Sequence, residues 1–275
     1  MRTLSCYSLL LLLCICFALD AEEKPQRIIS LAPHITEMVY AVGAGDNLVA
    51  VSDYSDYPAQ ANQLPKVANF AGIHIEAVLA LRPDLVIAWK TGTPVADVER
   101  LQQLGIKVAY SDPLQLDDIA SELTLIGEIT GNAKQGRALA EQFRQQLNEL
   151  RANYAVKRKV KVFFAMGTEP VSTVANNAWP QQMLTLCGAD NPFAKVKGDY
   201  PQVGLEHVLA AKPDVIIQAS GASAATDFSY WQAYPVIPAV KHRRFIALNA
   251  DHIYRTTPRT LLGITQLCQA LDNYR

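Results

Sequence analysis

Aromatic side chains follow several apolar segments of this chain, at the point where each segment ends. Trp89 directly follows Leu85–Ala88, and Tyr54 comes shortly after Leu48–Val51. The faces of aromatic rings bind large flat molecules by stacking and apolar contact. We therefore interpret these positions as parts of a site for a large, flat ligand. The alternative is that Tyr54 is a buried residue of a surface turn and that Trp89 packs in the core at the end of a buried strand.

The histidines do not form a metal-binding pattern. His34 follows the first apolar segment, Ile28–Leu31, and the other four are scattered along the chain: His74, His207, His242 and His252. No two of them are spaced i, i+4, and no cysteine lies nearby, so a closed metal site is not indicated. We expect His34 to be a hydrogen-bonded structural residue. The alternative is that it supplies one imidazole ligand to the metal ion of a bound molecule.

The common catalytic motifs are also missing from the sequence. There is no Gly-x-Ser-x-Gly elbow, no glycine-rich phosphate-binding loop and no cysteine near a histidine. The formal net charge is −1, with acids and bases interspersed, so nothing indicates a nucleic acid partner. The sequence favours a protein that binds a small molecule and does not transform it.

The first residues are typical of a secretory signal peptide. Met1 and Arg2 precede the apolar run Leu9–Ala18, which ends abruptly at the polar stretch Asp20–Gln26. The run is shorter than the ~20 apolar residues that a membrane-spanning helix needs. We predict a signal peptide over residues 1–21, with a lipoprotein anchored through Cys14 or Cys16 as the alternative.

Export has a consequence for the cysteines. Only Cys187 and Cys268 remain after removal of the predicted leader. Two thiols in an oxidising compartment are expected to pair, so we predict a disulfide between them. Two buried free cysteines are the alternative.

The chain contains an internal repeat. The segment Ile75–Ile87 recurs as Leu205–Ile217, with Glu, Val-Leu-Ala and Pro-Asp in the same register, so that Glu76 corresponds to Glu206. A second pair of similar segments, Gly43–Asn47 and Cys187–Asn191, each follows a helical pattern. Each half therefore has the pattern of a β/α unit, with a short helix, a Pro-Asp turn and a strand buried on both faces. The repeat predicts two similar lobes.

A long helical pattern separates the two halves. Gly131-Asn132 interrupts the pattern, and an apolar stripe then continues to Tyr154. We predict an α/β fold of two Rossmann-like lobes with mainly parallel sheets, joined by one long α-helix. The expected parts are an N-terminal lobe over residues 22–130, the connecting helix over 131–156, with Asn132 as its N-cap, and a C-terminal lobe over 157–275. Ligands of such sheets bind beyond the carboxyl ends of the strands, which places the site in a cleft between the lobes.

Three segments carry a resemblance to a known family. They are Val51–Pro58 (VSDYSDYP), Pro83–Trp89 (PDLVIAW) and Pro201-Gln202-Val203 ahead of Glu206. Together with the rest of the mature chain, they resemble the periplasmic cobalamin-binding proteins of vitamin B12 ABC importers, which are class III solute-binding proteins. The resemblance implies a monomeric periplasmic protein that carries cobalamin as cargo, not as a cofactor, to an inner-membrane permease and ATPase complex.

The resemblance also implies site residues. The expected ligand-binding positions are Tyr54, Phe70, Trp89, Tyr200 and the segment Ile253, Tyr254, Arg255, Thr256 and Thr257, which would wrap the ligand as a loop; His34 is a further candidate. Phe70 and Tyr200 stand where the family usually has tryptophan, and His34 stands where a small polar residue is usual. Glu76 and Glu206 are expected to meet arginines of the permease. Their alternative role is to stabilise the amino-terminal ends of two helices.

Two alternative functions remain open at this stage. A receptor for haem or a ferric siderophore would use the same fold, and Tyr54, His34 and Arg255 are compatible with such a ligand. A periplasmic enzyme on the same duplicated scaffold is the more distant alternative, since no nucleophile and base lie near one another in the sequence.

Overall fold

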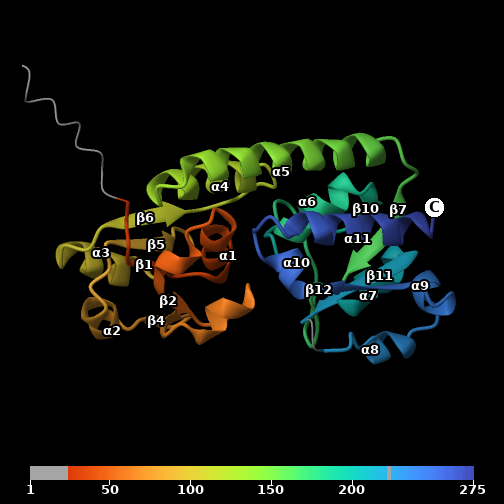
Figure 1. Cartoon of the computed structure of the whole chain (residues 1–275). Coiled ribbons are helices and arrows are strands. Elements are labelled where there is room, and N and C mark those ends of the chain that lie inside the picture. Colours follow the sequence, from red (N-terminus) through yellow and green to blue (C-terminus); the bar gives the residue numbers. More distant parts are fainter. Residues whose placement is uncertain (1–23, 222–223) are drawn as a thin grey trace, which may run out of the picture.

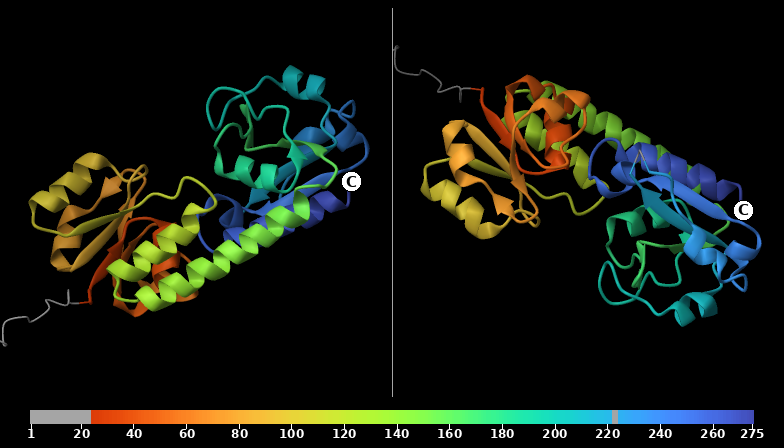
Figure 2. Two further views of the ribbon diagram at one scale, coloured as in Figure 1. Left: turned by 90° about the horizontal axis from the view of Figure 1, so that it is seen from above. Right: turned by 90° about the horizontal axis from the view of Figure 1, so that it is seen from below.

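The computed structural model describes residues 24–221 and 224–275, so the predicted signal peptide lies outside the described residues. The chain forms two α/β lobes, and helix α5 (Ala133–Tyr154) runs along both of them (Figures 1 and 2). Each of the two halves predicted from the sequence repeat thus contains its own main sheet.

The N-terminal lobe contains a six-stranded sheet with the order β4-β3-β2-β1-β5-β6. All neighbouring strands are parallel except β3 and β4, which are antiparallel. The strands are β1 (Ile28–Ser30), β2 (Leu48–Ser52), β3 (Lys66–Asn69), β4 (Gly72–Ile73), β5 (Leu85–Trp89) and β6 (Val108–Ser111), and the helices are α1 (Pro33–Ala41), α2 (Ile75–Ala80), α3 (Val95–Gln103) and α4 (Asp118–Ile129), with short 3₁₀ turns at Gly45–Asn47 and Ala59–Gln63.

The C-terminal lobe contains a four-stranded parallel sheet with the order β10-β7-β11-β12. A separate antiparallel pair, β8 and β9, follows β7. The strands are β7 (Val160–Phe164), β8 (Gly167–Thr168), β9 (Val171–Ser172), β10 (Ala189–Asp190), β11 (Val215–Ser220) and β12 (Phe245–Asn249), and the helices are α6 (Trp179–Leu186), α7 (Leu205–Ala211), α8 (Ser229–Gln232), α9 (Pro238–Lys241), α10 (Ala250–Tyr254) and α11 (Thr260–Asp272).

The sequence repeat corresponds to a repeated topology. Its first pair of segments forms α2 with β5 in one lobe and α7 with β11 in the other. Strand β5 lies between β1 and β6, and β11 lies between β7 and β12. The four-strand order β2-β1-β5-β6 of the first lobe is therefore matched by β10-β7-β11-β12 in the second. The predicted fold class is confirmed.

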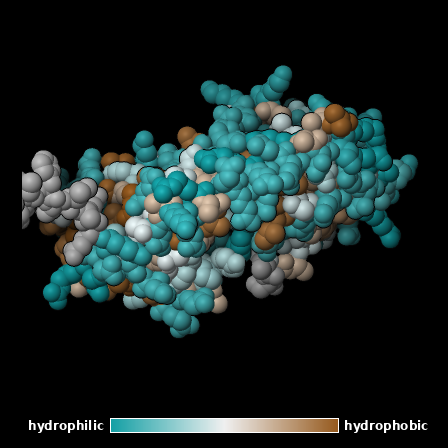
Figure 3. Space-filling model, turned by 45° about the horizontal axis from the view of Figure 1, so that its top comes forward, coloured by the Kyte–Doolittle hydropathy of each residue, from teal (hydrophilic) through white to brown (hydrophobic). Residues whose placement is uncertain are grey.

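Helix α5 connects the lobes as a stiff element. Its 22 residues span about 33 Å at 1.5 Å per residue. It packs on α4 of the first lobe and on α6 and α11 of the second. Gly136 allows the contact with α4, because a Cβ atom there would lie 2.5 Å from the carbonyl oxygen of Leu123. The opposite face of α5 is hydrophilic and faces solvent (Figure 3).

The start of α5 differs from the expectation in one respect. Asn132 occupies the N-cap position, but its side chain makes no capping hydrogen bond. Its amide nitrogen donates instead to the carbonyl oxygen of Val42 (2.8 Å), and its amide oxygen accepts from the ammonium of Lys24 (2.9 Å). The prediction that this side chain caps α5 is wrong, because tertiary partners from the first lobe take up its polar atoms.

One apolar cluster extends through both lobes. It includes Ile35 of α1, Phe143 and Leu147 of α5, Phe164 of β7 and Leu267 of α11. The disulfide Cys187–Cys268 belongs to the same cluster and joins the end of α6 to α11. Within residues 24–221 and 224–275, no helix is both long and apolar enough to cross a membrane.

Candidate ligand-binding site

Trp89 is an exposed residue at the carboxyl end of strand β5 of the N-terminal lobe. Residues Leu85–Ala88 of β5 are buried, whereas 41% of Trp89 is exposed. Its backbone N–H donates to Thr93 Oγ1 (3.1 Å), which fixes the turn after the strand. Gly92 leaves room for the ring, because a Cβ atom there would lie 1.9 Å from it. Sequence reasoning identified Trp89 but missed the requirement for Gly92.

His34 supports Trp89 from inside the lobe. The two rings meet edge to face, with centroids 5.4 Å apart and planes at 83°. His34 Nε2 lies 3.4 Å from the hydroxyl oxygen of Ser111. Burial lowers the pKa of His34 to about 4, although the negative charge of Asp112 opposes this shift. His34 is thus a buried neutral side chain, and since only 6% of it is exposed it offers little surface to a ligand.

Tyr54 lies in the loop after β2 and is 75% exposed. Its φ of +61° is a left-handed conformation that costs a non-glycine residue on the order of 1 kcal/mol. Hydrogen bonds from Thr36 Oγ1 to Ser55 Oγ (3.0 Å) and between Ser52 Oγ and Ser55 Oγ (3.1 Å) hold the loop in place. The surrounding contacts therefore maintain an exposed aromatic ring on a strained backbone.

Three side chains form a corresponding surface on the C-terminal lobe. Tyr200 is 53% exposed, Tyr254 is 38% exposed and Met166 is 37% exposed. The Tyr254 hydroxyl donates to Met166 Sδ (3.1 Å). Burial raises the pKa of both tyrosine hydroxyls, and the neighbouring Tyr200 raises that of Tyr254 further. Both tyrosines are therefore neutral hydrogen-bonding groups at physiological pH. Met166 was not predicted, since nothing in its sequence context distinguishes it from a core methionine.

Phe70 is the most exposed of the predicted aromatic residues. It lies between β3 and β4, and 93% of it is exposed. An apolar ring with so little support has no packing role in the chain as it stands. Its position at the tip of the antiparallel pair makes it available to a partner or ligand.

The segment 253–257 differs from the expected ligand-wrapping loop. Residues Ala250–Tyr254 form the short helix α10, and Ile253 has no exposed surface because it packs into the apolar cluster. Thr257 is equally buried, and its hydroxyl accepts the backbone N–H of Arg259 (3.2 Å). The expectation that Ile253 and Thr257 offer surface to a ligand does not match this structure. Tyr254 and the half-buried Thr256 remain accessible from this segment.

Arg255 is engaged within the protein. Its guanidinium lies 3.0 Å from Glu37 Oε1, 2.6 Å from Asp56 Oδ1 and 3.0 Å from Asp251 Oδ1. Its side chain is 14% exposed. Three carboxylates therefore satisfy Arg255, which was predicted to face the ligand.

Glu76 and Glu206 occupy the first turns of α2 and α7, one in each lobe (Figure 1). Both are exposed. Glu206 Oε1 lies 3.3 Å from His207 Nδ1, whereas Ala77 takes the corresponding place after Glu76. Both carboxylates are thus open to an external partner, as a docking role requires.

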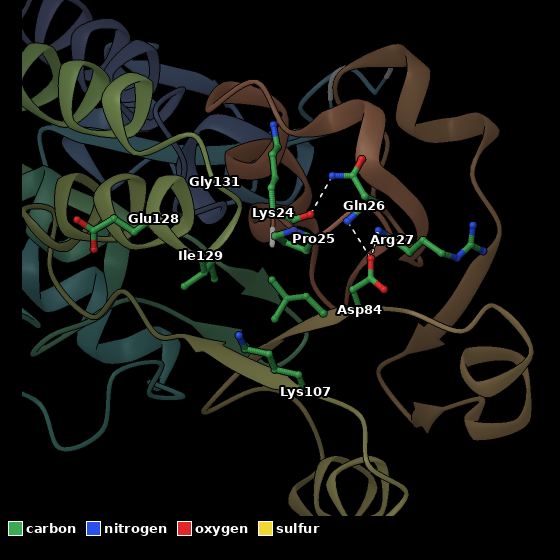
Figure 4. A pocket seen from close by; sticks show the side chains of 10 residues that line it. Lys24, Pro25, Gln26, Arg27, Asp84, Lys107, Glu128, Ile129 and Gly131 are labelled. Carbon is green, nitrogen blue, oxygen red and sulfur yellow. Dashed lines mark hydrogen bonds between the residues drawn. The ribbon is translucent and has the colours of Figure 1, made fainter. Parts of the chain in front are cut away.

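A cavity of about 830 Å³ is lined by none of these aromatic residues (Figure 4). Its lining includes Arg27, Asp84 and Lys107, which precede β1, β5 and β6. Asp84 accepts the backbone N–H groups of Gln26 (2.8 Å) and Arg27 (2.9 Å). The cavity is therefore at the amino ends of the parallel strands, opposite the edge where ligands of such sheets bind.

The described residues contain no group of three or more His, Cys, Asp or Glu side chains that could hold a metal ion. Two lobes with parallel sheets, one connecting helix and exposed aromatic rings after the strands define a solute-binding protein of the bilobed type. A family model described as "Periplasmic binding protein" matches residues 28–252. The chain belongs to this family.

Similar proteins extend over almost the whole chain. The vitamin B12-binding protein of Vibrio parahaemolyticus serotype O3:K6 is 39% identical over 256 residues, which cover 93% of this chain and 92% of the relative. The vitamin B12-binding protein of Vibrio cholerae serotype O1 is 43% identical over 247 residues, or 90% of this chain and 89% of the relative.

Solved structures show the same architecture. The periplasmic vitamin B12 binding protein BtuF of Vibrio cholerae has 42% identity and a TM-score of 0.82, covering 91% of this chain and 98% of that chain. The periplasmic heme-binding protein RhuT of Roseiflexus sp. RS-1 has 26% identity and a TM-score of 0.80, and the match covers 90% of this chain and 98% of that chain. The fold is thus shared by binding proteins for two different tetrapyrrole-type ligands.

Proposed function

We propose that this protein captures cobalamin in the periplasm and delivers it to an inner-membrane ABC transporter for import. The observation that carries the proposal is the exposure of aromatic rings after strands in both lobes, in a chain about 40% identical to vitamin B12-binding proteins. Cobalamin is cargo here, so it leaves the protein chemically unchanged. A single copy of the chain acts as the receptor.

The corrin ring is large and has two apolar faces, which suits binding by aromatic surfaces. Trp89, Tyr54 and Phe70 supply rings from the N-terminal lobe, and Tyr200 and Tyr254 supply rings from the C-terminal lobe. Covering such rings removes apolar area from water, at about 25 cal/mol for each Å². The tyrosine hydroxyls and Thr256 offer hydrogen bonds to the amide side chains at the rim of the corrin. His34 holds Trp89 in place and does not coordinate cobalt.

Delivery requires a second surface, for which Glu76 and Glu206 are the candidates. One exposed acid in the equivalent helix of each lobe suits a two-fold transporter that presents the same basic site twice. Such pairs form on docking, so removing the charges weakens association and leaves ligand binding intact. The test compares Glu76→Gln, Glu206→Gln and the double variant in cobalamin affinity and in transporter-dependent uptake. Unchanged uptake by the double variant contradicts the docking role, and lost cobalamin affinity assigns these acids to the site or the fold.

Haem is the second candidate ligand, because the heme-binding protein of Roseiflexus shares the fold at 26% identity. Haem needs an axial ligand from the protein. His34 is buried against Trp89 and Ser111, so the exposed Tyr54 would have to supply this ligand. A visible-spectrum titration separates the candidates. The mature protein is mixed with cyanocobalamin, haemin or a ferric siderophore and passed through a desalting column. We expect only the cobalamin spectrum to elute with the protein, in unmodified form; elution of haem or siderophore without cobalamin refutes the proposal.

A further inference from the structure

A cluster of charged side chains joins the two lobes. Glu37 of α1 accepts from Arg259 through both oxygens, Oε2 from Nε (2.8 Å) and Oε1 from the terminal nitrogen (2.5 Å), and Oε1 also accepts from Arg255 (3.0 Å). Asp56, after β2, accepts from Arg255 (2.6 Å). The carboxylates of Glu37 and Asp56 belong to the N-terminal lobe and both arginines belong to the C-terminal lobe. Asp251 completes the cluster at 3.0 Å from Arg255.

The cluster lies where α1 and α10 approach each other beneath α5 (Figure 1). Along α5 itself, the lobes are held by apolar packing, which is strong but not directional. Hydrogen-bonded charges have a narrow range of favourable geometry, and a guanidinium binding both oxygens of a carboxylate fixes orientation as well as distance. Helix α5 connects the lobes, and the charged cluster is suited to set the angle between them.

The charged side chains of this cluster are largely buried, which makes the loss of a partner costly. The side chain of Glu37 is 3% exposed, and those of Arg255 and Arg259 are 14% and 16% exposed. A carboxylate removed from water is costly unless its partners stay in place. Both partners of Glu37 come from the opposite lobe, so a rotation that separates the lobes there breaks both ion pairs. These contacts therefore favour the relative orientation of the lobes in which all of them form.

The same residues are directly linked to the exposed tyrosines. Asp56 follows Tyr54 by two positions, and Arg255 follows Tyr254. The guanidinium of Arg259 also stacks over the ring of Tyr57, 3.8 Å from its centroid. The cluster is therefore next in sequence to an exposed tyrosine of each lobe, and through Asp56 it includes the loop that carries Tyr54.

We infer that Glu37, through Arg255 and Arg259, is a positioning residue that sets the spacing of the two aromatic surfaces across which the ligand binds. The inference rests on the proposed function for the identity of the ligand. Its structural part, a defined angle between the lobes, does not depend on which ligand binds.

The test replaces the carboxylate with an amide of the same shape, Glu37→Gln. The control is Glu128→Gln, which makes the same change of charge at an exposed pair with Arg137 (3.4 Å) on the surface. Spin labels on cysteines introduced at Gln102 of α3 and Lys241 of α9, both exposed, report the distance between lobes. The native cysteines of the described residues are paired and take no label.

We expect Glu37→Gln to broaden or shift the distance distribution and to weaken cobalamin binding on the order of tenfold, since fewer molecules have the competent spacing. Glu128→Gln leaves both unchanged. An unchanged distribution, or an affinity within about twofold of the parent, overturns the inference. Arg259→Lys keeps the charge but loses the two-oxygen contact, so it must show the same change to a smaller degree if Glu37→Gln does not fold. A parent that fails to bind cobalamin refutes the proposed function, while the distance measurement still decides the role of Glu37.

Discussion

Replacing His34 by glutamine should make the protein less sensitive to acid. His34 is buried against Trp89 and its pKa is about 4, compared with 6.5 for an ordinary histidine. As pH falls below 6.5 the unfolded chain takes up a proton at this position, whereas the folded chain does so only near pH 4. The stability associated with neutral His34 is therefore fully present above pH 6.5 and is lost between pH 6.5 and 4.

The size of the effect follows from the shift. A difference of about 2.5 pKa units corresponds to about 3 kcal/mol at 1.36 kcal/mol for each unit, most of which is lost by pH 4.5. Glutamine has a similar size and retains a hydrogen bond to Ser111, so His34→Gln keeps the packing and removes the titration. Burial raises the pKa of Glu122, so its contribution to stability increases as pH falls. This contribution is the same in the parent and in His34→Gln and cancels in their comparison.

The measurement is urea unfolding followed by tryptophan fluorescence at pH 7 and pH 4.5. We expect the unfolding free energy of the parent to fall by about 2 to 3 kcal/mol more than that of His34→Gln over this range. His242→Gln, at an exposed position, is the matched control and should follow the parent. Equal losses in the parent and His34→Gln would show that His34 is not held neutral by burial, and the account of its role beneath Trp89 would be wrong.

Three further predictions concern the aromatic surfaces and the disulfide. Trp89→Ala and Tyr200→Ala should each weaken cobalamin binding by ~2 kcal/mol or more, as measured by titration calorimetry, with unchanged circular dichroism; parent-like affinity in both variants means that the site lies elsewhere. Gly92→Ala should displace the Trp89 ring and weaken binding in the same assay, because the added Cβ overlaps the ring; an unaltered affinity argues against contact between Trp89 and the ligand. Replacing Cys187 and Cys268 by serine opens a loop with a sequence separation of 81 and should lower the unfolding free energy by about 4 kcal/mol without changing cobalamin affinity; equal denaturation midpoints contradict the chain-entropy argument.

The sequence predicted the lobes well because the relevant signals are local. The Pro-Asp turn before each buried strand, at Pro83 and Pro213, marks the same helix-to-strand junction in both halves, and the apolar stripe up to Tyr154 identifies α5. These features depend on periodicity and turn chemistry within a few residues. They can therefore be predicted without knowledge of tertiary contacts.

The roles of the side chains at the site were harder to predict, because they depend on contacts between residues far apart in the sequence. Arg255 is a candidate ligand contact in the sequence, but its partners Glu37 and Asp56 are about 200 residues away along the chain. Asn132 is a residue type that often caps helices, but its side-chain amide donates to the carbonyl oxygen of Val42 and makes no capping hydrogen bond. The tertiary structure determines which partner a polar side chain binds, and the local sequence does not predict that partner.

The shared apolar cluster makes the two lobes dependent on each other. Ile35 of α1 and Leu267 of α11 belong to one continuous cluster that passes through Phe143 of α5, although they come from opposite ends of the chain. A chain cut after α5 would have to regain this packing by bimolecular association, and the effective concentration supplied by the covalent connection would be lost. Circular permutants that keep α5 intact should therefore tolerate new termini far better than split fragments tolerate separation.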